Sequence, residues 1–122
     1  MNHVLLVGRI THDLQLRTTN SGKHVLNFSL AVQNVFSQDA RADFLPCVVW
    51  GVAAENTAKY CEKGSLVAVS GKLNRRTYEN EKGQHSLMEV VVSDIRFYGK
   101  TQRKEDALSH FMIPDVQQPI AP

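Results

Sequence analysis

Residues 43–50 place two large aromatic side chains in one alternating row. If this segment is a β-strand, successive side chains point to opposite faces, so Phe44 and Trp50 lie on one face with Pro46 and Val48. The smaller apolar residues of the segment then lie on the other face. A proline and two large aromatics are unusual for the inside of a small barrel. We therefore expect this row to face outward.

A second segment, residues 66–78, alternates apolar residues with basic ones. One row holds Val67, Val69, Gly71 and Leu73, and we expect it to lie in the core. The opposite row holds Lys72, Asn74, Arg76 and Tyr78, and Arg75 adjoins it. If the two segments are neighbouring strands of a barrel, their outward rows combine aromatic rings and cations on one surface.

Aromatic faces interleaved with cations suit the binding of an unpaired nucleic-acid strand. Bases stack on the rings, and because every base has a π-face, the sequence of the strand matters little. Lys and Arg neutralise the phosphates and release counterions. Two simpler interpretations stay open. An aromatic row on a strand is more often core or subunit interface, and Lys72, Arg75 and Arg76 also fit an ordinary solvated surface.

The other reactive residue types predict no metal or catalytic site. None of the five histidines lies at metal-ligand spacing to another histidine or to a cysteine, and the carboxylates form no cluster of the kind that a metal-dependent nuclease needs. Cys47 and Cys61 are too few for a disulfide framework, so we expect buried, reduced thiols. We therefore expect no metal, no cofactor and no enzymatic activity.

Turn signals and side-chain alternation predict five strands and one helix. We expect strands in residues 4–7, 24–34, 43–50, 66–78 and 86–97, and a helix in residues 53–63 with Gly64 as its C-cap. Gly71 is expected to mark a bend. In the last strand, we expect apolar Leu87, Val91, Ile95 and Phe97 to alternate with polar Glu89 and Ser93. An all-β chain with one helix between strands three and four is typical of the OB-fold, a five-stranded Greek-key barrel.

Length and composition indicate one small domain. The chain has 122 residues, 43% of them hydrophobic, and a net charge of +2, which does not by itself predict a nucleic-acid partner. The sequence lacks a membrane span and the basic start of a signal peptide, so we expect a cytoplasmic protein. We expect the folded domain in residues 1–100 and a flexible tail in residues 101–122, which are rich in glutamine, proline and charge.

Several motifs resemble those of bacterial single-stranded DNA-binding proteins. In chain order, the main ones are Asn2-His3-Val4-Leu5-Leu6-Val7-Gly8-Arg9-Ile10-Thr11, Phe28-Ser29-Leu30-Ala31-Val32, Asp43-Phe44-Leu45, Val48-Val49-Trp50-Gly51, Ala54-Glu55-Asn56-Thr57-Ala58, Val69-Ser70-Gly71-Lys72-Leu73 and Arg76-Thr77-Tyr78-Glu79-Asn80. The resemblance covers about residues 1–98, and it is strongest to the shorter accessory forms of Gram-positive bacteria.

This resemblance implies an OB-fold that usually assembles as a homotetramer, around which single-stranded DNA wraps. The family's stacking positions correspond to Phe36, Phe44, Trp50 and Tyr78. Its basic contacts correspond to Arg76 and, less closely, to Arg9, Arg17, Lys72 and Arg75. The implied function is sequence-independent binding and protection of single-stranded DNA in replication, recombination, repair or DNA uptake.

The chain departs from the family pattern in its tail. Typical members end in a run of aspartates and Ile-Pro-Phe, which recruits other enzymes, whereas here only Phe111-Met112-Ile113-Pro114-Asp115 partly matches that pattern. The resemblance therefore leaves open whether the tail recruits protein partners, and one hypothesis is an accessory paralogue for DNA uptake or for a phage. Two alternatives are a protein-interaction OB module, which the four aromatics disfavour, and an OB-fold nuclease, which the lack of a carboxylate cluster disfavours.

Overall fold

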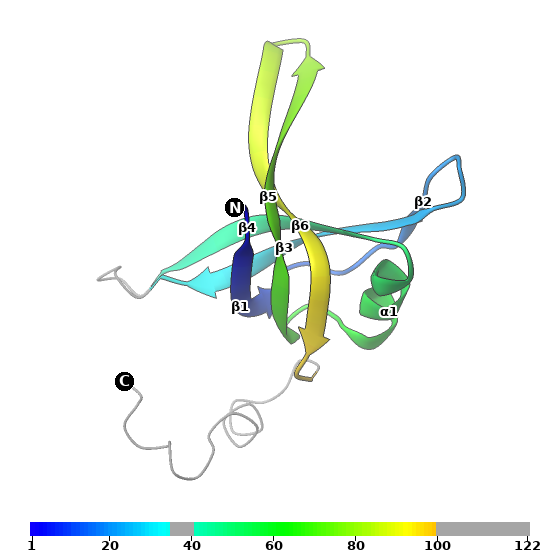
Figure 1. The fold of residues 1–122 in the computed structure, drawn as a ribbon, viewed down its shortest axis with the longest axis vertical. Helices are drawn as coiled ribbons and strands as arrows, with labels where there is room; N and C mark the ends of the chain where they lie inside the picture. Colours follow the sequence, from blue (N-terminus) through cyan, green and yellow to red (C-terminus); the bar gives the residue numbers. More distant parts are fainter. Residues whose placement is uncertain (35–40, 100–122) are drawn as a thin grey trace.

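The computed structural model describes residues 1–34 and 41–99, and these form strands and one helix (Figure 1). In chain order the elements are β1 (Val4–Ile10), β2 (Arg17–Thr18), β3 (His24–Gln33), β4 (Ala42–Trp50), α1 (Val52–Tyr60), β5 (Leu66–Asn80) and β6 (Gly83–Phe97). The five predicted strands and the predicted helix are therefore present, and the short β2 is an addition. The predicted loop aromatic Phe36 and the predicted tail of residues 101–122 lie outside the described residues.

Strand pairing closes the five long strands into a barrel. β1 pairs antiparallel with β5, β5 with β6, and β3 with β4, while β4 and β6 run parallel. The circle closes because the end of β1 also pairs with β3, where Arg9 lies opposite Ala31 and Ile10 opposite Leu30. This strand order, with α1 between β4 and β5, is the Greek-key barrel that the sequence predicts.

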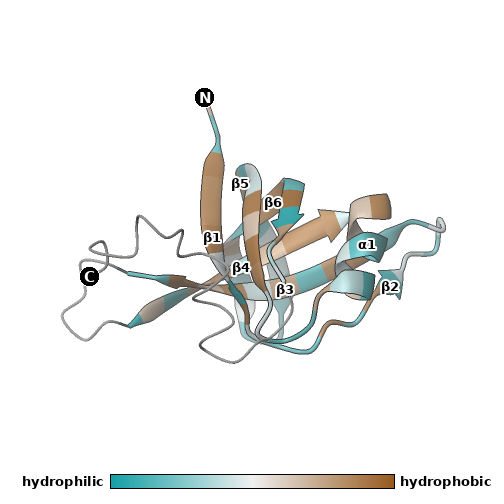
Figure 2. Cartoon of the chain, turned by 90° about the horizontal axis from the view of Figure 1, so that it is seen from below, coloured by the Kyte–Doolittle hydropathy of each residue, from teal (hydrophilic) through white to brown (hydrophobic). Residues whose placement is uncertain are grey.

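The core consists of the inward side chains of the barrel strands and one face of α1. Leu26, Leu30, Val49, Val67 and Val69 are each at most 1% exposed. α1 adds Ala54 and Thr57, which are fully buried. Figure 2 shows apolar residues concentrated along the barrel strands, whereas the connection that carries β2 is mostly polar. Within the described residues, the helix is too short and too polar to cross a membrane.

The helix ends earlier than predicted. α1 stops at Tyr60, and its C-cap is Cys61, whose N–H donates to the carbonyl oxygen of Thr57 at 3.0 Å. Because Cys61 turns into the core with extended backbone angles, the chain leaves the helix before it reaches Gly64. Gly64 instead adopts φ 92° and donates its N–H to the carbonyl oxygen of Ile10 at 2.7 Å, which fixes the chain to β1.

β5 and β6 continue past the barrel as a two-stranded arm, which we define as residues 72–91 (Figure 1). Every residue of β5 from Lys72 to Asn80 is exposed. The prediction that Leu73 lies in the core is therefore wrong, since its side chain is 43% exposed. Leu73 continues the inward row of Val67 and Val69, but it lies where the strand has passed the end of the barrel.

A β-bulge marks the base of the arm. Ser70 pairs with Asp94 but Gly71 pairs with Val92, so Ser93 is an extra residue in β6. A Cβ atom on Gly71 would clash with the carbonyl oxygen of Val91, so the two backbones approach as closely as they do only because this residue is glycine. At Gly71, where the sequence predicts a bend, the structure shows a β-bulge.

The bulge also changes which side chains of β6 share a face. Ile95 and Phe97 lie opposite Val69 and Val67 and follow the inward row. Leu87 and Val91 lie opposite Arg76 and Lys72, on the other face. The predicted single row of Leu87, Val91, Ile95 and Phe97 is therefore wrong, because the extra residue shifts the alternation by one.

Candidate nucleic-acid interface

One continuous face runs across five strands, β2 to β6, on the outside of the barrel and along the arm. Paired residues on neighbouring strands point to the same face. Trp50 pairs with Val25, which pairs with Arg17, and Val48 pairs with both Asn27 and Val91. Val91 in turn pairs with Lys72. We call this surface the outer face, and its members named so far are Arg17, Val25, Asn27, Val48, Trp50, Lys72 and Val91.

The three predicted stacking residues in the described part of the chain are all accessible. Phe44 is 65% exposed, Trp50 47% and Tyr78 44%. Their predicted outward orientation is confirmed, while their contact with a nucleic acid stays a prediction. Phe44 and Trp50 lie at opposite ends of β4, about 20 Å apart at the rise of a strand. Tyr78 lies far out on the arm and stacks on His85, with ring centroids 5.3 Å apart and planes at 28°.

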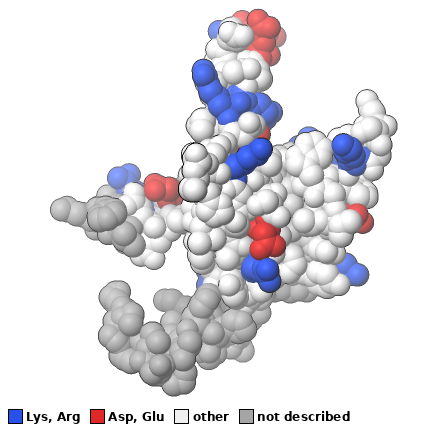
Figure 3. Space-filling model, in the orientation of Figure 1, with Lys and Arg blue, Asp and Glu red and all other residues white. Residues whose placement is uncertain are grey.

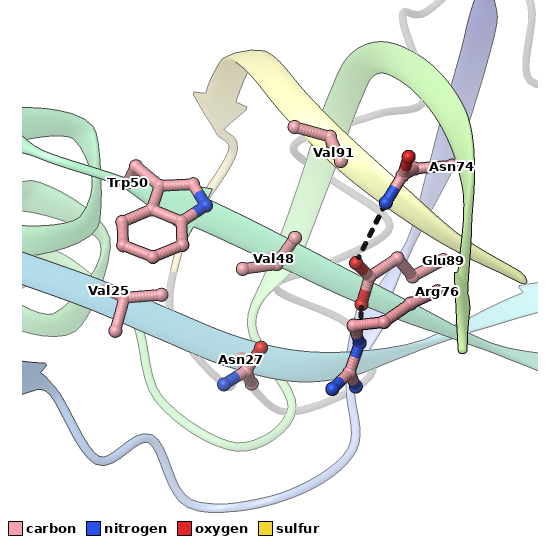
Figure 4. Close-up of a pocket in the computed structure, with 8 residues that line it drawn as sticks. All are labelled: Val25, Asn27, Val48, Trp50, Asn74, Arg76, Glu89 and Val91. Atoms are coloured by element: carbon pink, nitrogen blue, oxygen red, sulfur yellow. Dashed lines mark hydrogen bonds and ion pairs between the residues drawn. The ribbon is translucent and has the colours of Figure 1, made fainter. Parts of the chain in front are cut away.

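Val48 points to the outer face with Phe44 and Trp50, as predicted, but it is only 6% exposed. It lies at the bottom of a cavity of about 370 Å³, where the outer face is concave between β4 and the arm (Figure 4). The cavity is lined by Val25, Asn27, Val48, Trp50, Asn74, Arg76, Glu89 and Val91. Because the sheet is curved, the part of this row that contains Val48 and Trp50 lines a concave surface.

Glu89 forms part of the wall of this cavity. It is only 8% exposed, although it lies on the outer face. Its Oε1 is 3.4 Å from Nε of Arg76, and its Oε2 accepts a hydrogen bond from Nδ2 of Asn74 at 3.4 Å. A carboxylate tolerates such burial only when it is paired, so Arg76 and Asn74 hold Glu89 in the wall of the cavity.

The predicted cations of the arm lie on both of its faces. Lys72 and Arg76 share the outer face, and the Arg76 side chain is 55% exposed despite its ion pair. Arg75 pairs with Met88 and borders a separate shallow pocket on the reverse face of the arm with Thr77. Figure 3 shows basic groups gathered along the arm and acidic groups at its tip. The structure therefore brings Lys72 and Arg76, but not Arg75, onto the face of Trp50.

Arg17 and Arg9 lie at the two ends of the outer face. Arg17 is exposed in β2 and lies in the row of Val25 and Trp50. Arg9 pairs with Ala31, which pairs with Phe44, so Arg9 belongs to the opposite end of the face. Its guanidinium is partly committed, because Nη1 donates to the carbonyl oxygen of Gly64 at 2.9 Å.

Neither a metal centre nor an activated thiol accompanies this surface in the described residues. Within residues 1–34 and 41–99, no group of three or more His, Cys, Asp or Glu is arranged to hold a metal ion. Cys47 and Cys61 are buried thiols, as predicted. Burial raises the pKa of the Cys47 thiol from 9.0 to about 12, so this thiol stays protonated and unreactive at neutral pH.

The geometry combines accessible rings, cations and a hollow with an apolar base. Such a surface can hold planar aromatic groups in series and neutralise the anionic groups that connect them. Sequence reasoning missed the cavity residues Asn27, Asn74 and Glu89. The period-two pattern does place Asn27 and Asn74 in outward rows, and that was the available signal. The cavity itself depends on the pairing of β4 with β6. The alternation of side chains along one strand does not predict this pairing.

Comparisons with known proteins agree with this geometry. The model of the single-strand binding protein family matches residues 1–98. The single-stranded DNA-binding protein B of Bacillus subtilis (strain 168) is 44% identical over 110 residues, which are 87% of this chain and 97% of the relative. Single-stranded DNA-binding proteins of Staphylococcus aureus (strain MRSA252) and Clostridium tetani (strain Massachusetts / E88) are 40% identical over 121 residues and 45% identical over 101 residues. These alignments cover 97% and 80% of this chain, and 78% and 70% of the relatives. The chain belongs to the single-strand binding protein family.

Proposed function

We propose that this chain binds and protects single-stranded DNA independently of its sequence, without catalysing a reaction. Bases stack on Phe44, Trp50 and Tyr78, and cations neutralise the phosphates between them. The observation that carries the proposal is that Trp50 shares one continuous outer face with Lys72 and Arg76. Relatives at 40–45% identity are named single-stranded DNA-binding proteins. Such binding serves replication, recombination and repair.

The cations contribute unequally in this proposal. Arg76, Lys72 and Arg17 lie on the outer face and provide the main phosphate contacts. Arg9 contributes less, because Gly64 holds part of its guanidinium. Arg75 contributes only if the strand passes around the reverse face of the arm. Phe36 remains a proposed stacking residue by resemblance alone. We likewise keep residues 1–100 as the proposed binding domain and residues 101–122 as a separate tail.

We further propose that the protein assembles as a homotetramer. Residues 4–8 of β1 pair with β5 on one side, and only Arg9 and Ile10 pair with β3 on the other. This leaves one edge of residues 4–8 unpaired within the described part of the chain, next to the exposed side chains of Leu5 (69%) and Val7 (52%). An open strand edge with apolar neighbours readily adds a strand from a second copy.

One titration tests binding and assembly together. Fluorescence of Trp50 is followed while oligo(dT) or a duplex of equal length is added at two salt concentrations, and light scattering gives the mass of the protein and of the complex. We expect quenching by the single strand, weaker binding of the duplex, and lower affinity at higher salt. Equal binding of the two DNA forms, or no binding of either, would refute the proposed function.

A matched pair of variants tests the assembly surface. Leu5→Glu introduces a charge beside the open edge of β1, and Val52→Glu introduces the same charge at a side chain of α1 that is also 69% exposed. We expect Leu5→Glu to lower the mass measured by light scattering and Val52→Glu to leave it unchanged. Wild-type mass for both variants would move the interface away from β1, and a wild-type mass other than that of four chains would refute the tetramer.

A further inference from the structure

The cavity on the outer face combines apolar and polar lining residues in a way that suits a planar ring. Its base is apolar and formed by Val25, Val48 and Val91. In Figure 4, Trp50 borders this base on one side, and Glu89 with its two partners borders it on the other. A nucleobase has the matching asymmetry, since its faces are apolar and its edge carries hydrogen-bonding groups.

The polar wall of this cavity is centred on an acceptor. An ionised carboxylate offers about four acceptor positions and no donor. Glu89 uses one oxygen toward Arg76 and the other toward Asn74, and both separations are 3.4 Å, at the long end of hydrogen-bond distances. The side chain is only 10% exposed, so solvent supplies little of the remaining hydrogen bonding. The Glu89 carboxylate therefore has acceptor positions left for a hydrogen-bond donor on an incoming ring.

We propose that this cavity holds one base of the bound strand, and that Glu89 makes it favour bases with an exocyclic amino group. This inference rests on the proposed function, because it needs single-stranded DNA on the outer face. Cytosine offers its N4 amino group to a carboxylate, which is a known pairing in base recognition. Uracil and thymine offer a carbonyl oxygen at the same position, and this oxygen repels the carboxylate. Glu89 is thus a specificity-determining residue within otherwise sequence-tolerant binding.

The partners of Glu89 strengthen the preference for cytosine. Arg76 and Asn74 carry donors beside the carboxylate, and cytosine has acceptors at N3 and O2 next to its amino group. Uracil has a donor at N3, so its edge matches this wall less well. Stacking on Trp50 does not separate the two pyrimidines strongly, because both have a π-face of the same size. The discrimination between cytosine and uracil therefore depends on the polar wall of the cavity rather than on stacking against Trp50.

The test compares oligo(dC) with oligo(dU) of equal length, which differ at the base edge and not by a methyl group. Affinities are measured by anisotropy for the wild-type protein, for Glu89→Gln, and for Glu79→Gln, which removes the same charge from an exposed position on the arm. We expect the wild-type protein to bind oligo(dC) about fivefold more tightly or better, the low end for one base contact. Glu89→Gln should bring the ratio close to one, because an amide both donates and accepts, and Glu79→Gln should keep the wild-type ratio.

The outcomes separate three possibilities. A wild-type ratio near one, with both oligomers bound, overturns the inference and leaves the proposed function intact. Equal losses for both oligomers in Glu89→Gln also overturn it, because they assign Glu89 only the positioning of Arg76. Failure to bind either oligomer refutes the proposed function itself. Should Glu89→Gln not fold, wild-type protein with oligomers of N4,N4-dimethylcytosine decides: a loss of the cytosine advantage supports the inference, and an unchanged affinity overturns it.

Discussion

Replacing Trp50 separates stacking on DNA from packing on the protein. Trp50 is the last residue of β4, it is 47% exposed, and it borders the cavity on the outer face. If one base stacks on this ring, Trp50→Ala lowers the affinity for single-stranded DNA by about 1–3 kcal/mol, a factor of about 5 to 150. The same change also removes protein contacts, so a loss of affinity alone does not identify stacking.

The structure gives the size of the packing effect. About half of the indole is covered, which is about 100 Å² of a side chain that buries 150–250 Å² when fully enclosed. At about 25 cal/mol per Å², Trp50→Ala therefore lowers the free energy of unfolding by about 2.5 kcal/mol. Trp50→Leu keeps an apolar side chain over the same base and should lose only about 1 kcal/mol of stability. It lacks a π-face, so its loss of affinity should match that of Trp50→Ala.

The assay is anisotropy of a labelled oligo(dT) with the Ala, Leu and Phe variants of Trp50, together with urea unfolding of each. We expect the wild-type protein to bind most tightly, the Phe variant less tightly, and the Leu and Ala variants least tightly and equally. The free energy of unfolding of the Leu variant should instead be close to that of the Phe variant. Wild-type affinity in Trp50→Leu would refute stacking. Phe as weak as Ala would also refute it, because the remaining ring still offers a face to the base.

Three further changes test the arm, the bulge and the buried thiol. Arg76→Ala should weaken binding and reduce the slope of log affinity against log salt by about one, whereas Arg75→Ala, on the reverse face, should reduce it less; equal slopes would place DNA on both faces. Gly71→Ala should lower the free energy of unfolding in urea by about 1–3 kcal/mol, because its Cβ meets the carbonyl oxygen of Val91; wild-type stability would refute the close approach. The Cys47 thiol has a pKa of about 12 in the fold and 9.0 ordinarily, so its stabilising contribution is present below pH 9 and is lost as pH rises toward 12. Between pH 8 and pH 10, Cys47→Ala should therefore lose about 1.4 kcal/mol less stability than wild type in urea unfolding, and parallel curves would contradict the burial of this thiol.

The alternation of side chains predicted the outward aromatic row because β4 has a regular register from Phe44 to Trp50. Phe44 and Trp50 are six residues apart with no irregularity between them, so period two placed both rings correctly. The barrel was predictable for a similar reason, since turn signals and the position of one helix leave few arrangements of five strands. Burial along a row was less predictable. Val48 has the same parity as Trp50, but the concave sheet encloses it.

The arm shows that the alternation of side chains predicts their direction but not their burial. Parity assigns Leu73 to the inward row of Val69, and this is correct for its direction but wrong for its burial, because the barrel ends before residue 73. The end of a barrel is a property of strand lengths in three dimensions. A pattern along one strand does not reveal it.

The bulge at Ser93 explains both the wrong prediction for β6 and the existence of the cavity wall. If β6 kept the register of Ser70 with Asp94, Glu89 would lie opposite Arg75 and would share the reverse face with Leu73. With one extra residue, Glu89 lies opposite Asn74 and reaches Arg76 on the outer face. A slip of one residue exchanges the two faces of a strand. The bulge at Ser93, which interrupts the alternation along β6, therefore also places the Glu89 carboxylate in the cavity beside Trp50. The site and the exception to the pattern therefore have one structural cause, the bulge opposite Gly71.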